Sequence, residues 1–221
     1  MTAESVSERY GRWGLSGLLW RYSGLTVKPT LGTDLVLSGD LEFLAERKEH
    51  GLVEDRFTVE IQVAVDFPQS TPKVFETAGR IPKSFHRHKG GHLCLGSPLR
   101  LRLTLKRWPD LIGFVDRCVV PYLFSVSVWE RTGRMPYGEL AHGDRGLLDE
   151  YRGILRVESD DACMAALRIL AMKRRCANKM PCPCGSGRRL GRCHHKTFNR
   201  IRKSAGRVWL KSYVASLLGD T

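Results

Sequence analysis

The 221-residue sequence lacks several features that would assign it to a common class of protein. No run approaches the roughly 18 consecutive apolar residues of a membrane span, and the N-terminal WGLSGLLW is too short and interrupted for a secretory signal. Neither GxGxxG after a predicted strand nor GxxxxGKS/T occurs, so no ATP-binding phosphate loop is expected. These absences predict a cytoplasmic protein that has no membrane partner and does not itself activate a carboxylate with ATP.

The sequence also lacks the even number and the wide spacing of cysteines that are typical of a disulfide-bonded fold. Its seven cysteines are an odd number, and three of them lie within a dozen residues of one another. Such a distribution favours reduced thiols and a bound metal ion over disulfides.

Acidic residues are almost missing from the last 60 positions. Residues 1–161 hold 22 Lys and Arg against 22 Asp and Glu, whereas residues 162–221 hold 14 against one, Asp220. The formal charge of +13 therefore belongs to the C-terminal part, and two units are expected, 1–158 and 159–221. Residues 162–221 suit nonspecific contacts with nucleic-acid phosphates or an acidic protein surface. A merely solvated basic face is the alternative, and no base-reading signature is present.

In the first part of the sequence, apolar and polar residues alternate as they do in β-strands. Residues 57–67, FTVEIQVAVDF, place apolar and polar side chains on opposite sides almost without fault, which predicts a half-buried antiparallel strand. Residues 41–47 predict a preceding strand, and residues 49–55 a turn-rich connection between the two. An extended link over 68–72 leads to a short third strand around 74–75, which completes a meander.

A helical period follows the meander. In WPDLIGFVDRCVVPYLF, residues 108–124, apolar side chains recur at helical spacing, Asp110 marks the start, and Pro121 predicts a kink or an early end. Cys118 lies on the apolar stripe and is expected in the core. An amphipathic segment with Trp13, Leu18, Leu19 and Trp20 predicts another helix. The fold class is therefore α+β, with an antiparallel meander and flanking helices.

Residues 85–96, FHRHKGGHLCLG, surround Cys94 with three histidines and two glycines. Cys94 can be a buried packing residue, a metal ligand with its histidines, or an exposed nucleophile. The spacing of the histidines does not match a common zinc pattern.

The segments FPQSTPKV and GHLCL together resemble ubiquitin-conjugating enzymes, in which a Tyr-Pro-x-x-Pro-Pro-x-Val segment precedes a Gly-x-Ile-Cys-Leu active-site loop. The resemblance covers roughly residues 10–155. The matching residues are Phe67, Pro68, Thr71, Pro72, Val74, Gly91, Leu93, Cys94 and Leu95. It implies that Cys94 receives an acyl group as a thioester from an activating enzyme acting in trans, and yields it to an amine. Gly90 and Gly91 would relieve backbone crowding, while Leu93 and Leu95 anchor the loop.

Two departures from this family pattern are visible. His86 occupies the place of the asparagine in the family's His-Pro-Asn triplet, and the family's tryptophan after the cysteine is missing, since Trp108 lies farther along the chain. We expect His86, His88 or His92 to donate a hydrogen bond to the oxyanion or to relay a proton. The alternative for one or two of these histidines is a solvated loop position. The departures fit a divergent bacterial relative.

The segment MPCPCGSGRRLGRCHH spans residues 180–195 and brings cysteines and histidines into a short stretch. It closely resembles the SEC-C zinc motif, placed at 181–195. Three cysteines and one histidine predict a closed tetrahedral site for a structural Zn²⁺ ion, and free cysteines in a basic tail are the alternative. The expected ligands are Cys182, Cys184, Cys193 and His194, with His195 as the substitute for His194.

Helices are expected on both sides of this motif. Ser159 is followed by DDACMAALRILAMKRR, which has acidic residues at its start and basic residues at its end. This pattern predicts a helix that begins after Ser159. FNRIRKSAGRVWLKSYVASLL predicts one basic amphipathic helix, with Trp209, Tyr213 and Leu217 on one side. Cys163 and Cys176 lie outside the zinc spacing and are expected to be structural.

These resemblances give a leading functional hypothesis and two alternatives. The first is a bacterial conjugating-enzyme-like acyltransferase; relatives in antiphage defence operons imply, as a protein substrate, a cGAS-like nucleotidyltransferase. The second is a non-catalytic adaptor that keeps the fold and uses the zinc-containing tail to recruit a partner. The third is a nonspecific nucleic-acid-binding protein in which Cys94 is incidental.

Overall fold

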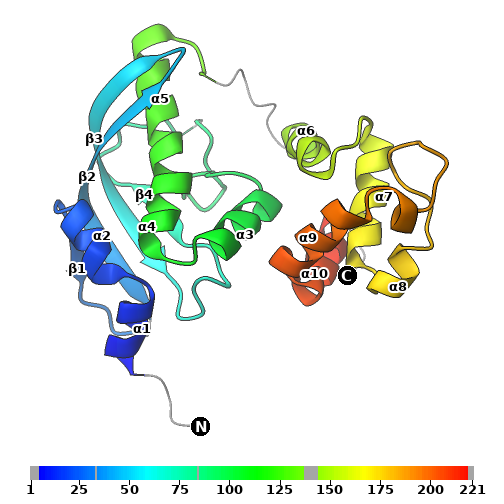
Figure 1. Ribbon diagram of the computed structural model, residues 1–221. Coiled ribbons are helices and arrows are strands. Elements are labelled where there is room, and N and C mark those ends of the chain that lie inside the picture. Colours follow the sequence, from blue (N-terminus) through cyan, green and yellow to red (C-terminus); the bar gives the residue numbers. More distant parts are fainter. Residues whose placement is uncertain (1–4, 33, 84, 137–143, 219–221) are drawn as a thin grey trace. The chain divides into compact units, whose positions relative to one another are not determined.

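The computed structural model describes residues 5–32, 34–83, 85–136 and 144–218 (Figure 1). The chain divides into two compact units, one of Met1–Gly96 with Arg107–Leu140 and one of Ser97–Lys106 with Ala141–Thr221. The sequence-based boundary after residue 158 differs from this division. The C-terminal unit also takes in the segments 97–106 and 144–158, which contribute Leu99, Tyr151, Leu155 and Val157 to its core.

The N-terminal unit contains a four-stranded antiparallel sheet in the order β1-β2-β3-β4. The strands are β1 (Leu25–Lys28), β2 (Leu35–Arg47), β3 (Gly51–Val63) and β4 (Lys73–Glu76). The predicted meander is confirmed and gains β1, which pairs with β2. Strand β3 begins at Gly51, so the connection from β2 is shorter than the expected turn over 49–55.

The alternation in β3 buries one face of the sheet. Val59, Ile61 and Val63 are fully buried, and their neighbours face the other side. The strand ends at Val63, before the end of the alternating pattern at residue 67. Phe67 reaches the core from the following turn, where its carbonyl accepts a 3.0 Å hydrogen bond from the indole Nε1 of Trp13.

Two short helices precede the sheet, α1 (Val6–Arg12) and α2 (Leu15–Arg21). The predicted N-terminal helix is thus interrupted at Trp13 and Gly14, where Gly14 has a left-handed φ of 69°. Trp13 and Leu18 are fully buried, whereas Trp20 is 87% exposed, so this tryptophan does not belong to the core.

The long helix expected after Asp110 runs through α4 (Leu111–Phe114), a π-helical turn (Val115–Val119) and α5 (Val120–Thr132), and α5 packs on β2 and β3 (Figure 1). The Asp110 side chain caps its start by accepting from the Gly113 N–H. The helix continues past Pro121 instead of ending there. The π turn beside this residue accommodates the missing proline N–H, as helix irregularities do. Cys118 is buried, as predicted.

Helix Leu111–Thr132 has 22 residues, and an 18-residue stretch of it has a mean hydropathy of 1.6, so it is long and apolar enough to cross a membrane by length and composition. The criterion of consecutive apolar residues misses it because polar residues interrupt it. Its most apolar stretch is 72% buried within the protein, as in a core helix of a soluble domain.

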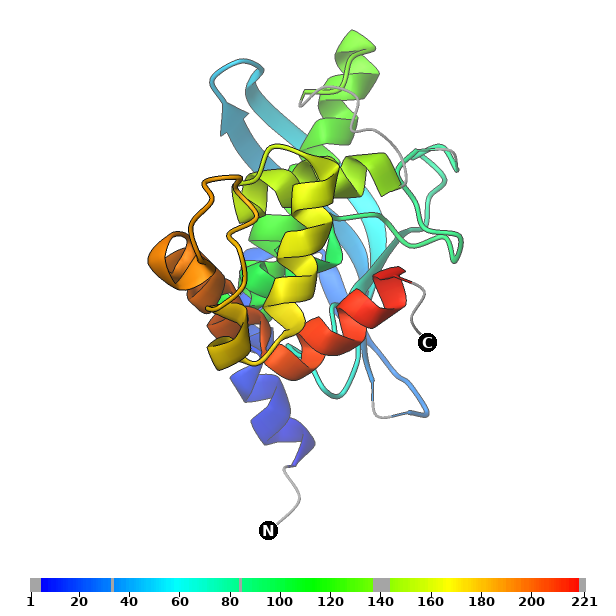
Figure 2. The ribbon, with the colours of Figure 1, turned by 90° about the vertical axis from the view of Figure 1, so that its right-hand side faces the viewer.

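The C-terminal unit is helical. Its elements are α3 (Pro98–Arg107), α6 (Asp144–Leu155), α7 (Asp160–Ala171), α8 (Arg174–Ala177), the 3-10 helix η2 (Leu190–Arg192), α9 (His195–Ala205) and α10 (Arg207–Leu218). Helix α7 contacts α6, α9 and α10 (Figure 2). Ser159 caps α7 as predicted, by accepting from the Ala162 N–H.

The basic amphipathic segment after the cysteines forms two helices, where one was expected. Gly206 separates α9 from α10 with a φ of 84°, a left-handed conformation that glycine adopts readily. Trp209 and Tyr213 stack with ring centroids 4.8 Å apart, and the Tyr213 hydroxyl lies 2.5 Å from that of Tyr151. The apolar side of this segment therefore packs into the core of the unit.

One buried cation supports this helical packing. The Arg202 guanidinium donates to the carbonyls of Leu170 at 3.2 Å and Ile169 at 2.9 Å, the last turn of α7. The carbonyls of a last helical turn are not all used by backbone bonds of the helix itself, and here that of Ile169 also accepts from the Met172 N–H at 3.2 Å. The negative end of the helix dipole favours a cation there. Burial lowers the pKa of Arg202.

Candidate functional site

Cys94 lies at the end of a short hairpin formed by residues 86–94, which we call the Cys94 hairpin. Its N–H donates to the carbonyl of His86 at 2.8 Å, and the N–H of His88 donates to the carbonyl of His92 at 2.9 Å. Gly91 closes the turn with a φ of 83°. The glycine pair therefore permits the tight reversal that returns the chain to Cys94.

The Cys94 hairpin is fixed to the sheet next to its cysteine. The N–H of Leu93 donates to the carbonyl of Val74 in β4 at 2.7 Å, and the Leu93 side chain is 2% exposed. Cys94 and Leu95 are only partly buried. Leu93 is thus the apolar anchor, and the cysteine beside it is partly exposed.

A buried carboxylate organises the base of the hairpin. The Glu76 side chain is fully buried and accepts hydrogen bonds from the backbone N–H groups of Ala78, Arg80 and Ile81 at 2.9–3.2 Å. The Arg87 guanidinium donates to Glu76 at 3.0 Å and to the carbonyl of Ile81 at 2.8 Å. A buried charge is tolerated when it is paired and hydrogen-bonded in this way.

Tyr122 of α5 connects the same hairpin to the core helix. Its hydroxyl donates to the carbonyl of His86 at 3.2 Å, so this carbonyl accepts from both Tyr122 and the Cys94 N–H. Burial raises the pKa of Tyr122, and a negative charge on Cys94 raises it further. The hydroxyl therefore stays protonated at neutral pH and is a permanent donor next to the cysteine.

The three histidines occupy different places on the hairpin. His88 and His92 stack with ring centroids 4.2 Å apart, and His92 also packs edge-on against Phe75. The ring of His86 packs edge-on against Phe85. Burial lowers the pKa of His92, and the charges of His88 and Lys73 lower it further. His92 is thus neutral at pH 7 and able to accept a proton.

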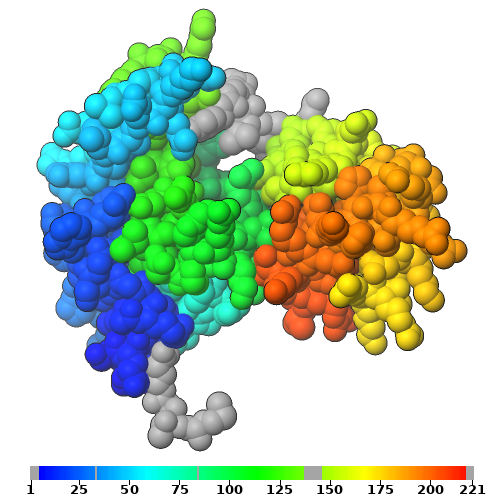
Figure 3. All heavy atoms as spheres, viewed as in Figure 1, coloured from blue at the N-terminus to red at the C-terminus, as the bar shows by residue number. Residues whose placement is uncertain are grey.

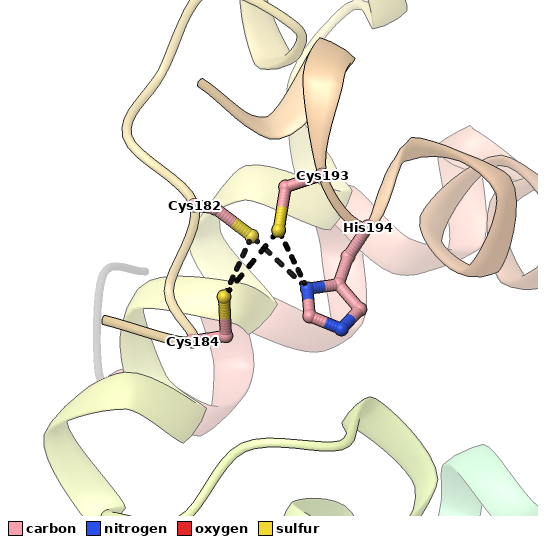
Figure 4. Close-up of side chains that lie close together, drawn as sticks. All are labelled: Cys182, Cys184, Cys193 and His194. Atoms are coloured by element: carbon pink, nitrogen blue, oxygen red, sulfur yellow. Dashed lines mark hydrogen bonds between the residues drawn. The ribbon is translucent and has the colours of Figure 1, made fainter. Parts of the chain in front are cut away.

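The second site lies in the C-terminal unit and joins the four predicted ligands (Figure 4). His194 Nδ1 lies 3.2 Å from Cys182 Sγ and 3.3 Å from Cys193 Sγ. Cys184 Sγ lies 3.4 Å from Cys182 Sγ and 3.5 Å from Cys193 Sγ. All four ligand atoms lie within 4.8 Å of one another. The sequence-based ligand set is therefore brought together in space.

The dimensions of this cluster fit a metal ion. A tetrahedral ion with metal–sulfur bonds of about 2.3 Å separates its sulfur ligands by roughly 3.8 Å, close to the distances found. In the part of the chain that the structure describes, no other group of three or more metal-ligating side chains comes together. Cys94 and its histidines are therefore not brought together as a metal site.

Local structure positions the four ligands. The segment 181–189 folds back through glycines 185 and 187, both with φ near 70°, and the Cys182 N–H donates to the Arg188 carbonyl at 2.8 Å. Leu190 is fully buried and starts η2, which leads into Cys193 and His194. A buried leucine thus ties the turn that carries the cysteines to the core of the unit.

The environments of two cysteines differ. Burial raises the pKa of the Cys182 thiol to about 11, and the hydroxyl of Ser186 contributes most to lowering that of Cys184, to about 6. A bound metal ion would hold both as thiolates, because the thiolate is the metal-binding form.

His195 differs from its neighbour. It lies outside the cluster, and its Nδ1 is buried without a hydrogen-bond partner. The cluster that could hold a metal ion therefore contains His194 and not His195. Of the two remaining cysteines in this unit, Cys163 is fully buried, in agreement with a structural role, whereas Cys176 is exposed.

Three residues beside Cys94 have no counterpart among the residues expected from the sequence: Glu76, Arg87 and Tyr122. Tyr122 falls within the predicted helical segment 108–124 without a signal for a role at Cys94, and Glu76 and Arg87 carry no local spacing signal. No protein-family model and no curated protein matches the chain.

Proposed function

We propose that this protein is a ubiquitin-conjugating-enzyme-like acyltransferase that carries an acyl group as a thioester on Cys94. The main support for this proposal is the position of Cys94 in the structure. It is a partly exposed cysteine at the end of a hairpin that is hydrogen-bonded to the last strand of an antiparallel meander. A carrier needs such a position, because two different partners must approach the same sulfur in turn.

The acyl transfer would take place in two steps. In the first, the Cys94 thiolate attacks the carbonyl carbon of a carboxyl group activated by another protein; the C–S bond forms and the donor's activating group leaves. In the second, an amine attacks the thioester carbonyl, the C–N bond forms, and the C–S bond breaks to return the thiolate. The amine's proton passes to a base, for which neutral His92 is suited, with His86 and His88 as the other candidates.

The developing negative charge on the carbonyl oxygen needs a donor nearby. In the resemblance to ubiquitin-conjugating enzymes, His86 stands at the position of the family's asparagine. Its backbone carbonyl accepts hydrogen bonds from the Tyr122 hydroxyl and the Cys94 N–H. We assign His86 to this role. The Glu76–Arg87 pair then acts as a positioning element, because it holds the strand of the hairpin that carries His86.

The Cys/His cluster is proposed to hold Zn²⁺ in a structural role. Three cysteines and a histidine are the ligand set of closed structural zinc sites, in which no coordination position remains for a substrate. The bound ion would supply folding energy to the turn between residues 181 and 194.

The biological setting follows from the same resemblance. The protein would act in the bacterial cytoplasm within an antiphage defence operon, receive its acyl group from an activating enzyme in trans, and modify a protein such as a cGAS-like nucleotidyltransferase.

The test is the intact mass of the protein after incubation with its operon neighbours and ATP, under reducing and non-reducing conditions. Wild type is expected to carry an adduct that thiol reagents remove. Cys94→Ser should carry a thiol-resistant ester or no adduct, and Cys94→Lys a stable amide. Cys176→Ser is the matched control, because Cys176 is also exposed but lies outside both sites, and it should keep the thiol-sensitive adduct.

An adduct that survives on Cys94→Ala, or its absence from wild type with every neighbour and ATP present, would contradict acyl transfer through Cys94. The second result would favour the non-catalytic adaptor.

A further inference from the structure

Exposed cations surround the Cys/His cluster. We call the exposed Lys and Arg side chains between residues 173 and 200 the knuckle surface. Around α8 they are Lys173, Arg174, Arg175 and Lys179. The turn that carries the cysteines and the start of α9 supply five more. The C-terminal charge excess predicted from the sequence is therefore concentrated around one small structural element.

Backbone contacts show that these segments are neighbours in space. The N–H of Gly191 donates to the carbonyl of Asn178 at 3.0 Å, and the N–H of Leu190 donates to that of Met180 at 2.8 Å. These bonds place η2, with Arg189 and Arg192 at its ends, directly against the end of α8. Helix α9 follows at once from the cluster. In Figure 3 the gold to orange atoms of this segment form a continuous area.

The knuckle surface is not neutralised by the protein itself. No Asp or Glu occurs between Asp161 and Asp220. Among the described residues, the ion pairs of this unit use the acids of α6 and the start of α7, which pair with Arg100 and Arg152. None involves a cation of the knuckle surface within that part of the chain. Within the described ranges, the nine cations thus have no carboxylate partner, and Arg188 donates to Cys193 Sγ at 3.8 Å.

One cation of the knuckle surface, Arg174, acts electrostatically on the buried Arg202. After burial, the charge of Arg174 is the next cause that lowers the pKa of Arg202. Repulsion of this kind destabilises a folded unit and is relieved when an anionic partner binds.

The residue types of the knuckle surface indicate which kind of anion it would bind. Six of the nine cations are arginines, whose planar guanidinium binds phosphate through two parallel hydrogen bonds. The only Phe, Tyr or Trp residue between 162 and 200 is Phe198, which is 1% exposed. The surface therefore offers phosphate contacts but no aromatic platform for unstacked bases. That combination suits a double helix better than a single strand.

We propose that the knuckle surface binds the phosphate backbone of a nucleic-acid duplex, without reading its sequence. The Cys/His cluster and the buried Leu190 hold the turn rigid, so the arginines of the turn and of α8 meet the duplex as one preformed surface. This activity is separate from acyl transfer at Cys94 and does not depend on it.

The test is fluorescence anisotropy of the full-length protein with a 30-base-pair DNA duplex at several salt concentrations. Binding is expected to weaken steeply with salt, with a slope of log K against log[salt] of about −4 to −6 if five or six phosphates are contacted. Arg175→Gln/Lys179→Gln/Arg192→Gln should bind about 10-fold or more weakly and lose about three units of that slope. These three positions avoid Arg188, which contacts Cys193 Sγ at 3.8 Å.

A matched control variant distinguishes the effect of where the cations lie from the effect of the protein's net charge. Arg47→Gln/Lys48→Gln/Arg134→Gln removes the same formal charge from exposed positions of the N-terminal unit and should bind within about 2-fold of wild type. Cys94→Ser should bind like wild type, which makes failure here distinguishable from failure of acyl transfer. Metal content and thermal unfolding verify that each triple variant keeps its fold.

Several results would overturn the proposal. Among them are no binding at low salt, undiminished binding by the knuckle-surface variant, tighter binding to single-stranded than to duplex DNA, and competition by polyglutamate as effective per charge as the duplex. The last would assign the surface to an acidic protein. A duplex RNA of the same length should bind within a few-fold of the DNA duplex, since only phosphates are contacted, and a strong preference for one base sequence would contradict backbone recognition.

Discussion

Glu76 and Arg87 form an ion pair of 3.0 Å at the base of the Cys94 hairpin, in which the glutamate side chain is fully buried and the arginine is 12% exposed. The two residues are eleven positions apart and lie on either side of the segment that leads from β4 into the hairpin. The pair therefore closes this segment against the sheet.

Glu76→Gln is expected to lower the free energy of unfolding by about 3 kcal/mol, because it leaves the buried Arg87 cation without its counter-charge. Urea denaturation followed by tryptophan fluorescence measures this loss. Arg56→Gln is the comparison, since its pairs with Asp40 and Glu42 are exposed and should be worth less than about 1 kcal/mol. A similar loss for both variants would show that burial of the Glu76–Arg87 pair is energetically unimportant.

Alkylation by iodoacetamide should distinguish the cysteines of the native protein. Cys94 is partly exposed and Cys176 is exposed, so both should be modified quickly, whereas buried Cys118 and Cys163 should react only after unfolding. Burial, aided by the charge of Asp160, raises the pKa of Cys163 to about 11, which further reduces its thiolate fraction. Peptide mass spectrometry after timed labelling gives each rate. Equal rates for Cys94 and Cys118 would contradict an accessible nucleophile.

Asp55 should make the N-terminal unit acid-sensitive. Burial alone would raise its pKa, but hydrogen bonds from Arg80, Ser127 and the Arg56 N–H lower it from 3.8 to about 2. Because the folded pKa lies below the unfolded one, the contribution is present above about pH 4 and is lost as the pH falls towards 2. A shift of this size corresponds to up to about 2 kcal/mol.

Asp55→Asn tests this dependence by urea denaturation at a series of pH values. The variant should be less stable at pH 7, and its stability should fall less steeply than that of wild type between pH 4 and 2. Parallel curves for the two proteins would show that another carboxyl group is responsible.

Removing the metal should affect the C-terminal unit first. We expect a strong chelator or Cys182→Ser to release one metal ion per chain and to lower the melting temperature of this unit, because the ion ties Cys182 and Leu190, both buried, into its core. Elemental analysis and calorimetry measure the two effects. Cys176→Ser, which changes an exposed cysteine outside the cluster, should alter neither. Full metal content in Cys182→Ser would exclude Cys182 as a ligand.

Local sequence patterns were sufficient to predict those parts of the fold whose residues interact with close neighbours along the chain. The alternating pattern predicted β3, Asp110 and Ser159 predicted the starts of their helices, and the spacing of three cysteines and a histidine within 13 residues predicted the cluster. In each case the period, the cap or the ligand spacing is a local property, so the order of residues contains it directly.

The surroundings of Cys94 and the division of the chain into units depend on tertiary packing between distant segments. Helix α3 is not among the predicted elements, because its leucines alternate with polar residues, and it joins the C-terminal unit through Leu99 and Tyr151, which are 52 positions apart. The hydrogen bond from Tyr122 to His86 likewise joins residues 36 positions apart. Contacts of this kind depend on where packing brings distant segments, and no local period or spacing in the sequence specifies them.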